Sequence, residues 1–286
     1  MSRLGGLCPD SAGIPVGHGL CESFLENVTS PERPRPRLSA SHAQSVGSDR
    51  ADRTLADHST KQALQAAPMK LYGHYISLTT LQVMALLAEK RSSAELALVD
   101  VFAGEQKLAA HLARHPFGYI PVLEDGGFTL YETHAILRYL DSRLPGPSHL
   151  PTDVHERARM DQWLCIEQNY LLPAAKKVMA REYAKMMKLA DPGLALVEEG
   201  ERELRVVIGE FADWIANRTY VAGDALSLAD LCWLADLYKM SALPQMEAIF
   251  AGARVEAWWK PLTERTEWKR AVAELASYGP KSPSPP

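Results

Sequence analysis

Hydrophobic and polar positions follow regular periods only from residue 69 onward. Alternating runs predict strands, and apolar residues at intervals of three and four predict amphipathic helices. The pattern gives a strand within 69–75, a helix over 78–90, a strand within 95–101, a helix over 105–115, two strands within 119–132 and a helix over 133–144. The last two strands turn at Asp125, Gly126 and Gly127, residues that are typical of a hairpin.

The chain beyond this region has a different character. After a Pro-containing linker at 145–153, residues 154–277 show long helical periods and no convincing strand. The predicted fold class is therefore α/β plus all-α. A thioredoxin-like βαβαββα domain over 69–145 is followed by an all-helical domain over 154–277.

Both ends of the chain lack such periodicity. Residues 1–68 are rich in Ser, Pro, Gly and Arg, and residues 278–286 are rich in Pro, so a disordered leader and a disordered tail are expected. The leader holds seven Lys and Arg against seven Asp and Glu, unlike an acid-poor transit peptide. An alternative is that translation begins at Met69, where the patterned sequence starts.

Composition narrows the classes of function. A formal net charge of −4 provides no basic surface for nucleic acid or for an anionic membrane. No run reaches the ~18 apolar residues of a membrane span and no signal peptide is recognisable, so a soluble, cytoplasmic protein is expected. Wide spacing predicts free thiols and no metal site for the four cysteines, which are Cys8, Cys21, Cys165 and Cys232.

Ser77 is the first candidate for chemistry, because it lies where the first strand gives way to the first helix. Unpaired backbone N–H groups and the helix dipole favour an anion at such a position. A hydroxyl that donates to a bound thiolate would lower the pKa of that thiol. The alternative is that Ser77 serves only as the helix N-cap.

Other positions near predicted element ends could hold a ligand. Pro121, if cis, would turn the backbone of Ile120 toward an extended ligand, although a trans turn proline is the ordinary alternative. Glu132 and Thr133 open a helix and could grip a carboxylate, or simply cap it. Lys107 near a helix start suggests a nearby anion, or a solvated surface lysine.

A second capping signal lies further along the chain, where Ser227 and Asp230 have the spacing of a capping box. Such a pair satisfies backbone N–H groups at the beginning of a helix. It therefore indicates a folding signal and not a catalytic pair.

Four stretches in this order identify a family resemblance over residues 69–275. They are "MKLYGHYIS", "HLARHPFGYIPVLEDGGFTLYETHAILRYL", "YVAGDALSLADL" and "VEAWWKPLTER". Together they resemble the soluble glutathione transferases, most closely the phi class known from plants and also found in microbes. The resemblance implies a cytosolic homodimer in which glutathione is a co-substrate and no further cofactor is needed.

The resemblance also implies roles for individual residues. Ser77 activates the glutathione thiol, Ile120 pairs with the cysteinyl backbone and Pro121 is cis. The glycine carboxylate is held by Gln106 and Lys107, and the γ-glutamyl end by Glu132 and Thr133. Two departures stand out: Gln106 replaces a usual histidine, and Gln82 replaces an arginine common along the first helix, which is expected to affect packing or local charge.

The implied reaction is attack by the glutathione thiolate on small hydrophobic electrophiles or hydroperoxides in an apolar pocket between the domains. Leu78 and Tyr170 are candidates for that pocket, and Phe117 is a candidate anchor of the dimer interface. Packing roles are predicted for Trp163, Leu164, Trp258 and Trp259. Alternatives are a glutathione-dependent peroxidase or isomerase on the same site, or a non-catalytic ligand-binding module.

Overall fold

The computed structural model describes residues 69–186, 189–250 and 255–280. The leader predicted for residues 1–68 lies outside the described residues, as do Cys8, Cys21 and the end of the tail at 281–286. The limits 69–145 and 154–277 stay predictions of domain extent. Within the described residues, no helix combines the length and the apolar character needed to cross a bilayer.

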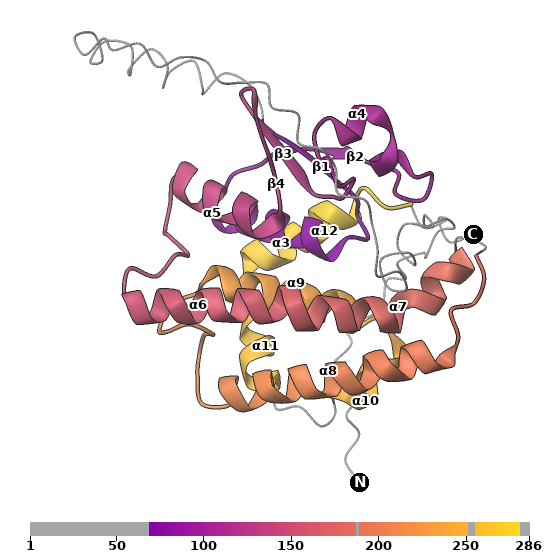
Figure 1. Ribbon diagram of the computed structural model, residues 1–286. Helices are drawn as coiled ribbons and strands as arrows, with labels where there is room; N and C mark the ends of the chain where they lie inside the picture. Colours follow the sequence, from indigo (N-terminus) through magenta and orange to yellow (C-terminus); the bar gives the residue numbers. More distant parts are fainter. Residues whose placement is uncertain (1–68, 187–188, 251–254, 281–286) are drawn as a thin grey trace, which may run out of the picture.

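The first half of the described chain holds a four-stranded sheet in the order β2-β1-β3-β4 (Figure 1). Strand β1 runs parallel to β2 and antiparallel to β3, which in turn pairs antiparallel with β4. The elements are β1 (Lys70–Gly73), α3 (Leu78–Glu89), β2 (Glu95–Leu98), η1 (Glu105–Lys107), α4 (Ala109–Leu112), β3 (Val122–Asp125), β4 (Phe128–Tyr131) and α5 (Thr133–Arg143). This order confirms the predicted thioredoxin-like arrangement.

The second predicted helix differs from the expectation. The structure replaces one helix over 105–115 by the short 3-10 turn η1 and the four-residue α4. Leu108 between them has an extended backbone with ψ of 151°, so the helical hydrogen-bond ladder cannot pass through it. Lys107 therefore ends a 3-10 turn and does not lie near the start of a long helix.

Helix α3 is buried nearly all round, and its sequence explains this. Its residues LTTLQVMALLAE carry few charges, and such a helix is stable only when other elements cover it. It packs against α5 and also against α9 (Leu228–Met240) and α12 (Thr266–Ala276) of the second half. Figure 1 shows α12 beside α3 beneath the sheet, so α3 joins the two halves of the molecule.

The second half is helical throughout its described residues, as predicted. Its elements are α6 (Val154–Ile166), η2 (Glu167–Leu171), α7 (Leu172–Met186), α8 (Leu194–Ile215), α9, α10 (Pro244–Phe250), α11 (Glu256–Thr263) and α12. Segment η2 is a π-helical turn that connects α6 to α7 without a break. Helices α7 and α8 pack along each other, and α8 lies on the side of α7 that is turned away from the sheet.

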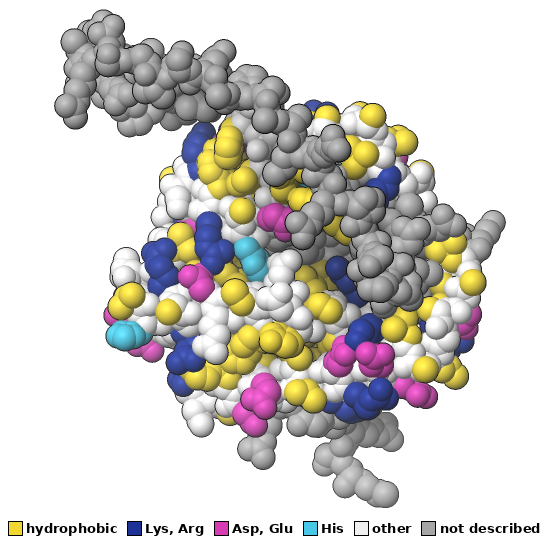
Figure 2. Space-filling view, in the orientation of Figure 1, with side chains coloured by type: hydrophobic (Ala, Val, Ile, Leu, Met, Phe, Trp, Pro, Cys, Tyr) yellow, Lys and Arg dark blue, Asp and Glu magenta, His cyan; other side chains and the backbone are white. Residues whose placement is uncertain are grey.

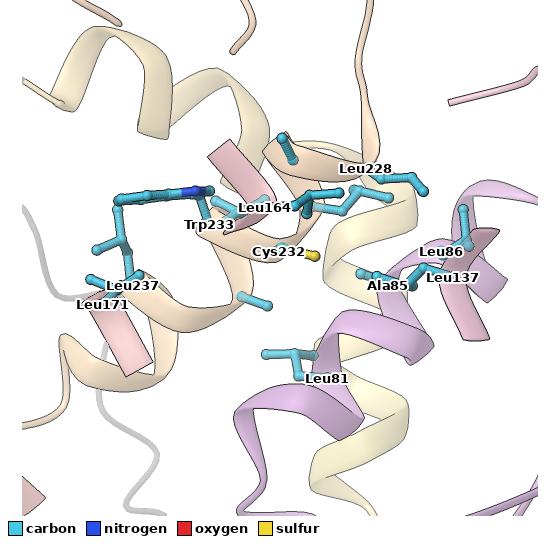
Figure 3. Packing of buried hydrophobic residues seen from close by; sticks show 14 of the residues in the cluster. Leu81, Ala85, Leu86, Leu137, Leu164, Leu171, Leu228, Cys232, Trp233 and Leu237 are labelled. Carbon is cyan, nitrogen blue, oxygen red and sulfur yellow. The ribbon is translucent and has the colours of Figure 1, made fainter. Parts of the chain in front are cut away.

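A large hydrophobic cluster spans both halves (Figure 3). Leu81 of α3 lies in the same core as Cys232 and Trp233 of α9. Trp163, Leu164 and Trp258 are buried in this cluster and Trp259 packs against it, which confirms the predicted packing roles. The Trp163, Phe211 and Trp233 rings stack or meet edge to face, an arrangement that adds to the apolar burial.

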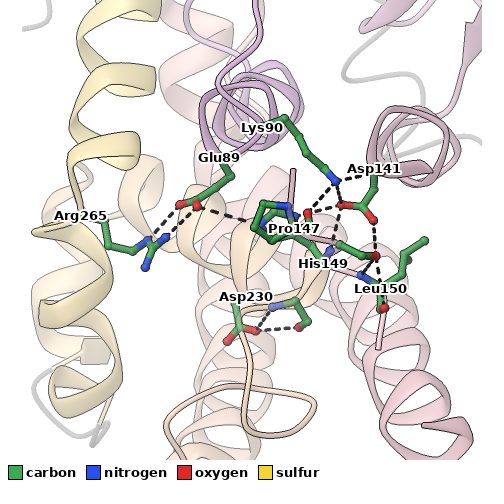
Figure 4. A network of polar contacts seen from close by, with 10 residues as sticks. Glu89, Lys90, Asp141, Pro147, His149, Leu150, Asp230 and Arg265 are labelled. Carbon is green, nitrogen blue, oxygen red and sulfur yellow. Dashed lines mark hydrogen bonds and ion pairs between the residues drawn. The ribbon is translucent and has the colours of Figure 1, made fainter. Parts of the chain in front are cut away.

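Polar contacts also connect the halves at the linker between α5 and α6 (Figure 4). The Glu89 carboxylate at the end of α3 accepts two hydrogen bonds from Arg265, which precedes α12. Asp230 accepts from the backbone N–H of Ser227 at 2.9 Å and from its hydroxyl at 2.7 Å, so the predicted capping pair forms. The same carboxylate accepts from the Trp258 indole, which connects α9 to α11.

Candidate active site

A pocket of about 470 Å³ opens between the two halves. One wall comes from the β1–α3 loop, the segment before β3 and the beginning of α5. The other wall comes from η2 and α7. Of the residues proposed from sequence, the pocket is lined by Ser77, Leu78, Gln106, Ile120, Pro121, Glu132 and Thr133.

Ser77 is the N-cap of α3, and its hydroxyl oxygen accepts a hydrogen bond from the Thr80 N–H at 3.1 Å. Thr79 Oγ1 lies 3.0 Å from the same oxygen. A cap uses a lone pair of the oxygen, whereas activation of a thiol uses the O–H proton. The capping interpretation and the catalytic one are therefore compatible in this geometry.

The loop that carries Ser77 is held from the helical half. Lys239 of α9 donates to the Tyr75 carbonyl at 2.8 Å, and burial lowers the pKa of Lys239 to about 8. His74 packs edge to face against Phe102, and burial lowers the pKa of His74 to about 4, against the opposing effect of Asp100. His74 is therefore neutral near pH 7, and the loop is fixed by contacts on both sides.

Ile120 and Pro121 are joined by a cis peptide bond, as predicted. They lead into β3, whose neighbour on one side is β1 and on the other β4. Thr79 donates to the Ile120 carbonyl at 3.4 Å, which links this segment to the first turn of α3. The segment and Ser77 therefore share one side of the pocket.

Glu132 has an unusual backbone, with φ of 71° and ψ of 114°. Positive φ is strained for a residue with a side chain, and such strain is concentrated at binding and catalytic sites. The Glu132 carbonyl accepts from the Ile136 N–H, so α5 begins directly after the strained residue. Glu132 and Thr133 both line the pocket at this helix start.

Gln106 and Lys107 are neighbours in sequence, but only Gln106 lines the pocket. Gln106 is buried and lines the pocket, and its Oε1 has no hydrogen-bond partner among the described residues. Lys107 lies outside the pocket lining, donates to the Phe117 carbonyl at 3.0 Å and sits over the Tyr119 ring. The structure therefore brings Gln106 to the pocket and does not bring Lys107 there.

His115 is a lining residue that the sequence did not single out. Its ring stacks on Tyr131, with centroids 4.5 Å apart. Burial lowers the pKa of His115 to about 4, and the nearby His111 and Lys107 act in the same direction. His115 is therefore an uncharged part of the wall at neutral pH.

The helical wall is one stripe of side chains on η2 and α7, formed by Gln168, Leu172, Lys176, Met179 and Tyr183. Their spacing of four, four, three and four residues is that of a single helix face. Tyr170 is two residues from Gln168, which turns it about 200° around the helix axis. It is 61 % exposed and lines a different hollow, so the structure does not bring Tyr170 to this pocket.

Sequence reasoning missed this stripe, although its period was available. Apolar residues at 172, 179 and 183 flank a lysine at 176 on the same helical face.

In the described part of the chain, no group of three or more His, Cys, Asp or Glu side chains is arranged to hold a metal ion.

Comparisons with known proteins agree with this geometry. Two family models match, the glutathione S-transferase N-terminal domain over 67–142 and the C-terminal domain over 175–265. A probable glutathione S-transferase GSTF2 of Oryza sativa subsp. japonica is 34% identical over 208 residues, which are 72% of this chain and 97% of the relative. A glutathione S-transferase hmp2 of Hypomyces subiculosus is 34% identical over 210 residues, 72% of this chain and 98% of the relative.

Solved structures agree as well. Glutathione transferase F7 from Populus trichocarpa superimposes with a TM-score of 0.65 at 31% identity, over 73% of this chain and 99% of that one. Maize glutathione S-transferase I in complex with an atrazine glutathione conjugate gives 0.65 at 30% identity, over 74% and 99%. The chain therefore belongs to the glutathione S-transferase family and is a glutathione transferase similar to the phi-class enzymes of plants.

Proposed function

We propose that the protein is a cytoplasmic enzyme that conjugates the glutathione thiolate to hydrophobic electrophiles, with Ser77 as the residue that stabilises the thiolate. The observation that carries the proposal is the position of Ser77. Its hydroxyl caps α3 on the wall of a pocket that Ile120, Glu132 and Thr133 also line. The helix dipole and the hydroxyl proton then favour the same anion.

The electrostatics of this wall suit a thiolate. At neutral pH a free thiol is mostly protonated, and each unit of pKa depression is worth ~1.4 kcal/mol of preference for the anion. The Thr80 N–H donates to the Ser77 oxygen, and the Ser77 O–H, which is within reach of Thr79 Oγ1, would turn to the sulfur of bound glutathione. The sulfur then attacks an electrophilic carbon, the C–S bond forms, and the leaving group departs with its electron pair.

The remaining lining residues divide between the two reactants. Gln106 offers an amide donor for the glycine carboxylate, the Ile120 backbone pairs with the cysteinyl unit, and Glu132 with Thr133 holds the γ-glutamyl end. The Gln106 Nε2 donates to the Val101 carbonyl at 3.5 Å and keeps a second N–H that would donate to the carboxylate. Lys107 is proposed to contribute its charge at longer range, and Leu78 forms part of the electrophile wall.

Ser77→Ala is expected to lower kcat/KM for an activated aryl halide at least about tenfold, equal to ~1.4 kcal/mol of transition-state stabilisation. Ser77→Gly is the matched variant, because glycine costs an N-cap only a few tenths of a kcal/mol. Calorimetry should show that both variants still bind glutathione. Asp153→Ala removes the cap of α6, far from the pocket lining, and should leave the rate unchanged.

The outcome separates the alternatives. A full rate in Ser77→Gly would contradict the serine role, even if Ser77→Ala were slow through loss of the cap. If the wild type binds glutathione but conjugates no electrophile, reduction of cumene hydroperoxide is the next assay, and activity there would favour the peroxidase alternative. Binding without either activity would favour a ligand-binding module.

We further propose that the enzyme is a homodimer in which Phe117 anchors the interface. Phe117 is 49 % exposed in the segment before β3. A hollow on the helical half is lined by Ile166, Tyr170, Val206 and Trp214 among others. Figure 2 shows hydrophobic side chains gathered over this face, between α6 and α8. A two-fold dimer would place the Phe117 ring of each subunit against the hollow of the other.

Phe117→Asp is therefore expected to weaken dimerisation at least about tenfold, because a buried aromatic anchor is replaced by a charge. Sedimentation equilibrium measures the dissociation constant. Leu194→Asp is the control, since Leu194 is 59 % exposed and begins α8 at the end remote from the hollow. If Phe117→Asp and the wild type have the same dissociation constant for the dimer, Phe117 is not the anchor.

A further inference from the structure

The described part of the helical wall of the pocket contains one charged side chain. Lys176 lies between Leu172 and Met179 on the stripe of α7 that faces the pocket. The other members of the stripe on α7 are apolar or, like Tyr183, aromatic. A lysine in this position is not explained by packing, because an apolar side chain would continue the wall.

Lys176 is also not explained by an ion pair. Within the described residues, its ammonium forms no hydrogen bond and no salt bridge, whereas the adjacent Lys177 pairs with Glu199 and Glu203 of α8. Lys176 is exposed, and as a lining residue it is exposed toward the pocket. Restricted hydration between the walls lowers the pKa of Lys176, and the carboxylate of Glu167 opposes that shift.

Among the described residues that line the pocket, Lys176 is the only cation. His115 is neutral because burial lowers its pKa to about 4, and Lys107 lies outside the lining. Glu132, at the beginning of α5 on the opposite wall, is the one carboxylate among the lining residues that the structure describes. A partly dehydrated ammonium attracts an anion more strongly than one in open solvent.

We propose that Lys176 makes the enzyme selective for hydrophobic electrophiles that carry a carboxylate. The inference rests on the proposed conjugation and names its substrate class. Leu172 and Met179 on either side of the ammonium would contact the hydrocarbon part of the substrate. The ammonium would pair with its carboxylate.

The position of Lys176 favours the electrophile over glutathione as the source of the anion. The residues proposed to hold glutathione come from the sheet half, namely Gln106, Ile120, Glu132 and Thr133. Lys176 comes from α7, where its neighbours are apolar. The ion pair exists before and during the reaction, so it should lower KM for the electrophile with little effect on kcat.

A matched substrate pair tests the inference, with 4-chloro-3-nitrobenzoate and its methyl ester as probes. In both, the glutathione sulfur forms a bond to the ring carbon and chloride leaves with the C–Cl electron pair. Lys176→Met should lower kcat/KM about tenfold for the acid through KM, the effect expected of one charge-assisted contact. For the methyl ester, kcat/KM of the same variant should stay within about twofold of the wild-type value.

Two further variants control for charge and fold. Lys176→Arg should retain most of the preference for the acid, because the cation remains. Lys177→Met removes an equal charge one residue away, outside the pocket lining, and should behave like the wild type toward both substrates.

Each contrary result has a distinct meaning. Equal losses for acid and ester would overturn the inference while leaving the conjugation intact, and so would a rise in KM for glutathione instead of the electrophile. If the wild type conjugates neither probe, the proposed function fails. Calorimetry with the carboxylated glutathione conjugate and its methyl ester then still tests Lys176. Tighter binding of the acid that Lys176→Met abolishes supports the inference, and equal binding overturns it.

Discussion

Replacing Asp141 by asparagine is expected to lower the free energy of unfolding by about 3–5 kcal/mol, because it leaves the buried Lys90 ammonium without its counter-charge. The Lys90 and Asp141 side chains are each 1% exposed, and Lys90 Nζ lies 2.9 Å from Asp141 Oδ1. Lys90 also donates to the Pro147 carbonyl of the linker (Figure 4). The pair therefore ties the ends of α3 and α5 to the segment that leads into the helical half.

The pH dependence of this loss follows from two shifted groups. Burial favours a raised pKa for Asp141, but hydrogen bonds from His149 and Lys90 outweigh it and hold the pKa well below the ordinary 3.8. This stability is present above 3.8 and is lost as the pH falls through the lowered value. Burial favours a lowered pKa for His149, but its hydrogen bond to Asp141 and the Glu89 carboxylate 3.9 Å from its Nε2 outweigh that effect and raise the pKa above 6.5. Its contribution is present below 6.5 and is lost as the pH rises through the raised value.

Urea titration with tryptophan fluorescence measures the difference between wild type and Asp141→Asn. The difference should be largest between pH 3.8 and 6.5, the ordinary values of the two groups. Asp191→Asn is the control, since Asp191 forms an exposed pair with Arg181 and its loss should have no measurable effect. Adding Lys90→Met to Asp141→Asn should recover part of the loss. A loss no greater than that of Asp191→Asn would exclude a structural role for the buried pair.

Most of the fold was predictable because the relevant signals are local. The alternating strands around Leu71 and Leu123, the apolar run of α3 and the capping pair at Ser227 each specify their own element. The helix expected over 105–115 failed for the opposite reason. Its apolar period continues through Leu108, and only the tertiary position of the segment shows that the backbone is extended there.

The candidate site was predictable on one wall only. On the sheet side, Ser77, Pro121 and Glu132 stand at element ends, which sequence patterns mark well. On the helical side, a long helix offers several faces, and sequence alone does not show which one meets the pocket. The π-helical turn η2 adds to this difficulty, since it changes the phase of the helix just before Leu172. Only the structure shows that Lys176 lines this pocket and that Tyr170 does not.

Gln82 shows how one departure from the family pattern reaches across the molecule. Its fully buried amide donates to Glu167 at 2.9 Å and to Asp236 at 2.8 Å, both on the helical half. His134 of α5 also lies 2.9 Å from Glu167. An arginine at position 82 would bring a positive charge to two carboxyl groups, and glutamine brings none. The missing positive charge is therefore expected to affect Asp236, one of these two carboxyl groups.

Asp236 is expected to hold a proton at neutral pH. Burial raises the pKa of Asp236 well above 3.8, and the charge of Glu167 raises it further. The Glu167 carboxylate has its pKa lowered, against the effect of burial, by hydrogen bonds that include one from His134. Asp236 Oδ2 and Gln82 Oε1 have no partners among the described residues when the carboxyl is ionised. A proton on Asp236 supplies the donor that this cluster lacks.

Asp236→Asn is therefore expected to stabilise the protein at pH 7 by up to about 4 kcal/mol, since each pH unit above the ordinary pKa of 3.8 adds ~1.4 kcal/mol to the cost of binding the proton. The unfolded aspartate is ionised above 3.8, so the wild type must bind a proton to fold, and its stability falls as the pH rises from 3.8 toward the raised value. Asparagine supplies the same donor and acceptor without that uptake. The gain, measured by urea titration from pH 4 to 8, should grow with pH.

Two matched variants show whether the proton is the cause. Asp224→Asn removes an exposed carboxylate from the loop before α9, outside both pockets, and should leave the dependence of stability on pH as in the wild type. Asp236→Ala removes the acceptor for the Gln82 amide as well as the titratable group, so it should be less stable than Asp236→Asn at every pH. A wild type at least as stable as Asp236→Asn at pH 8 would mean that the carboxyl is ionised in the folded protein.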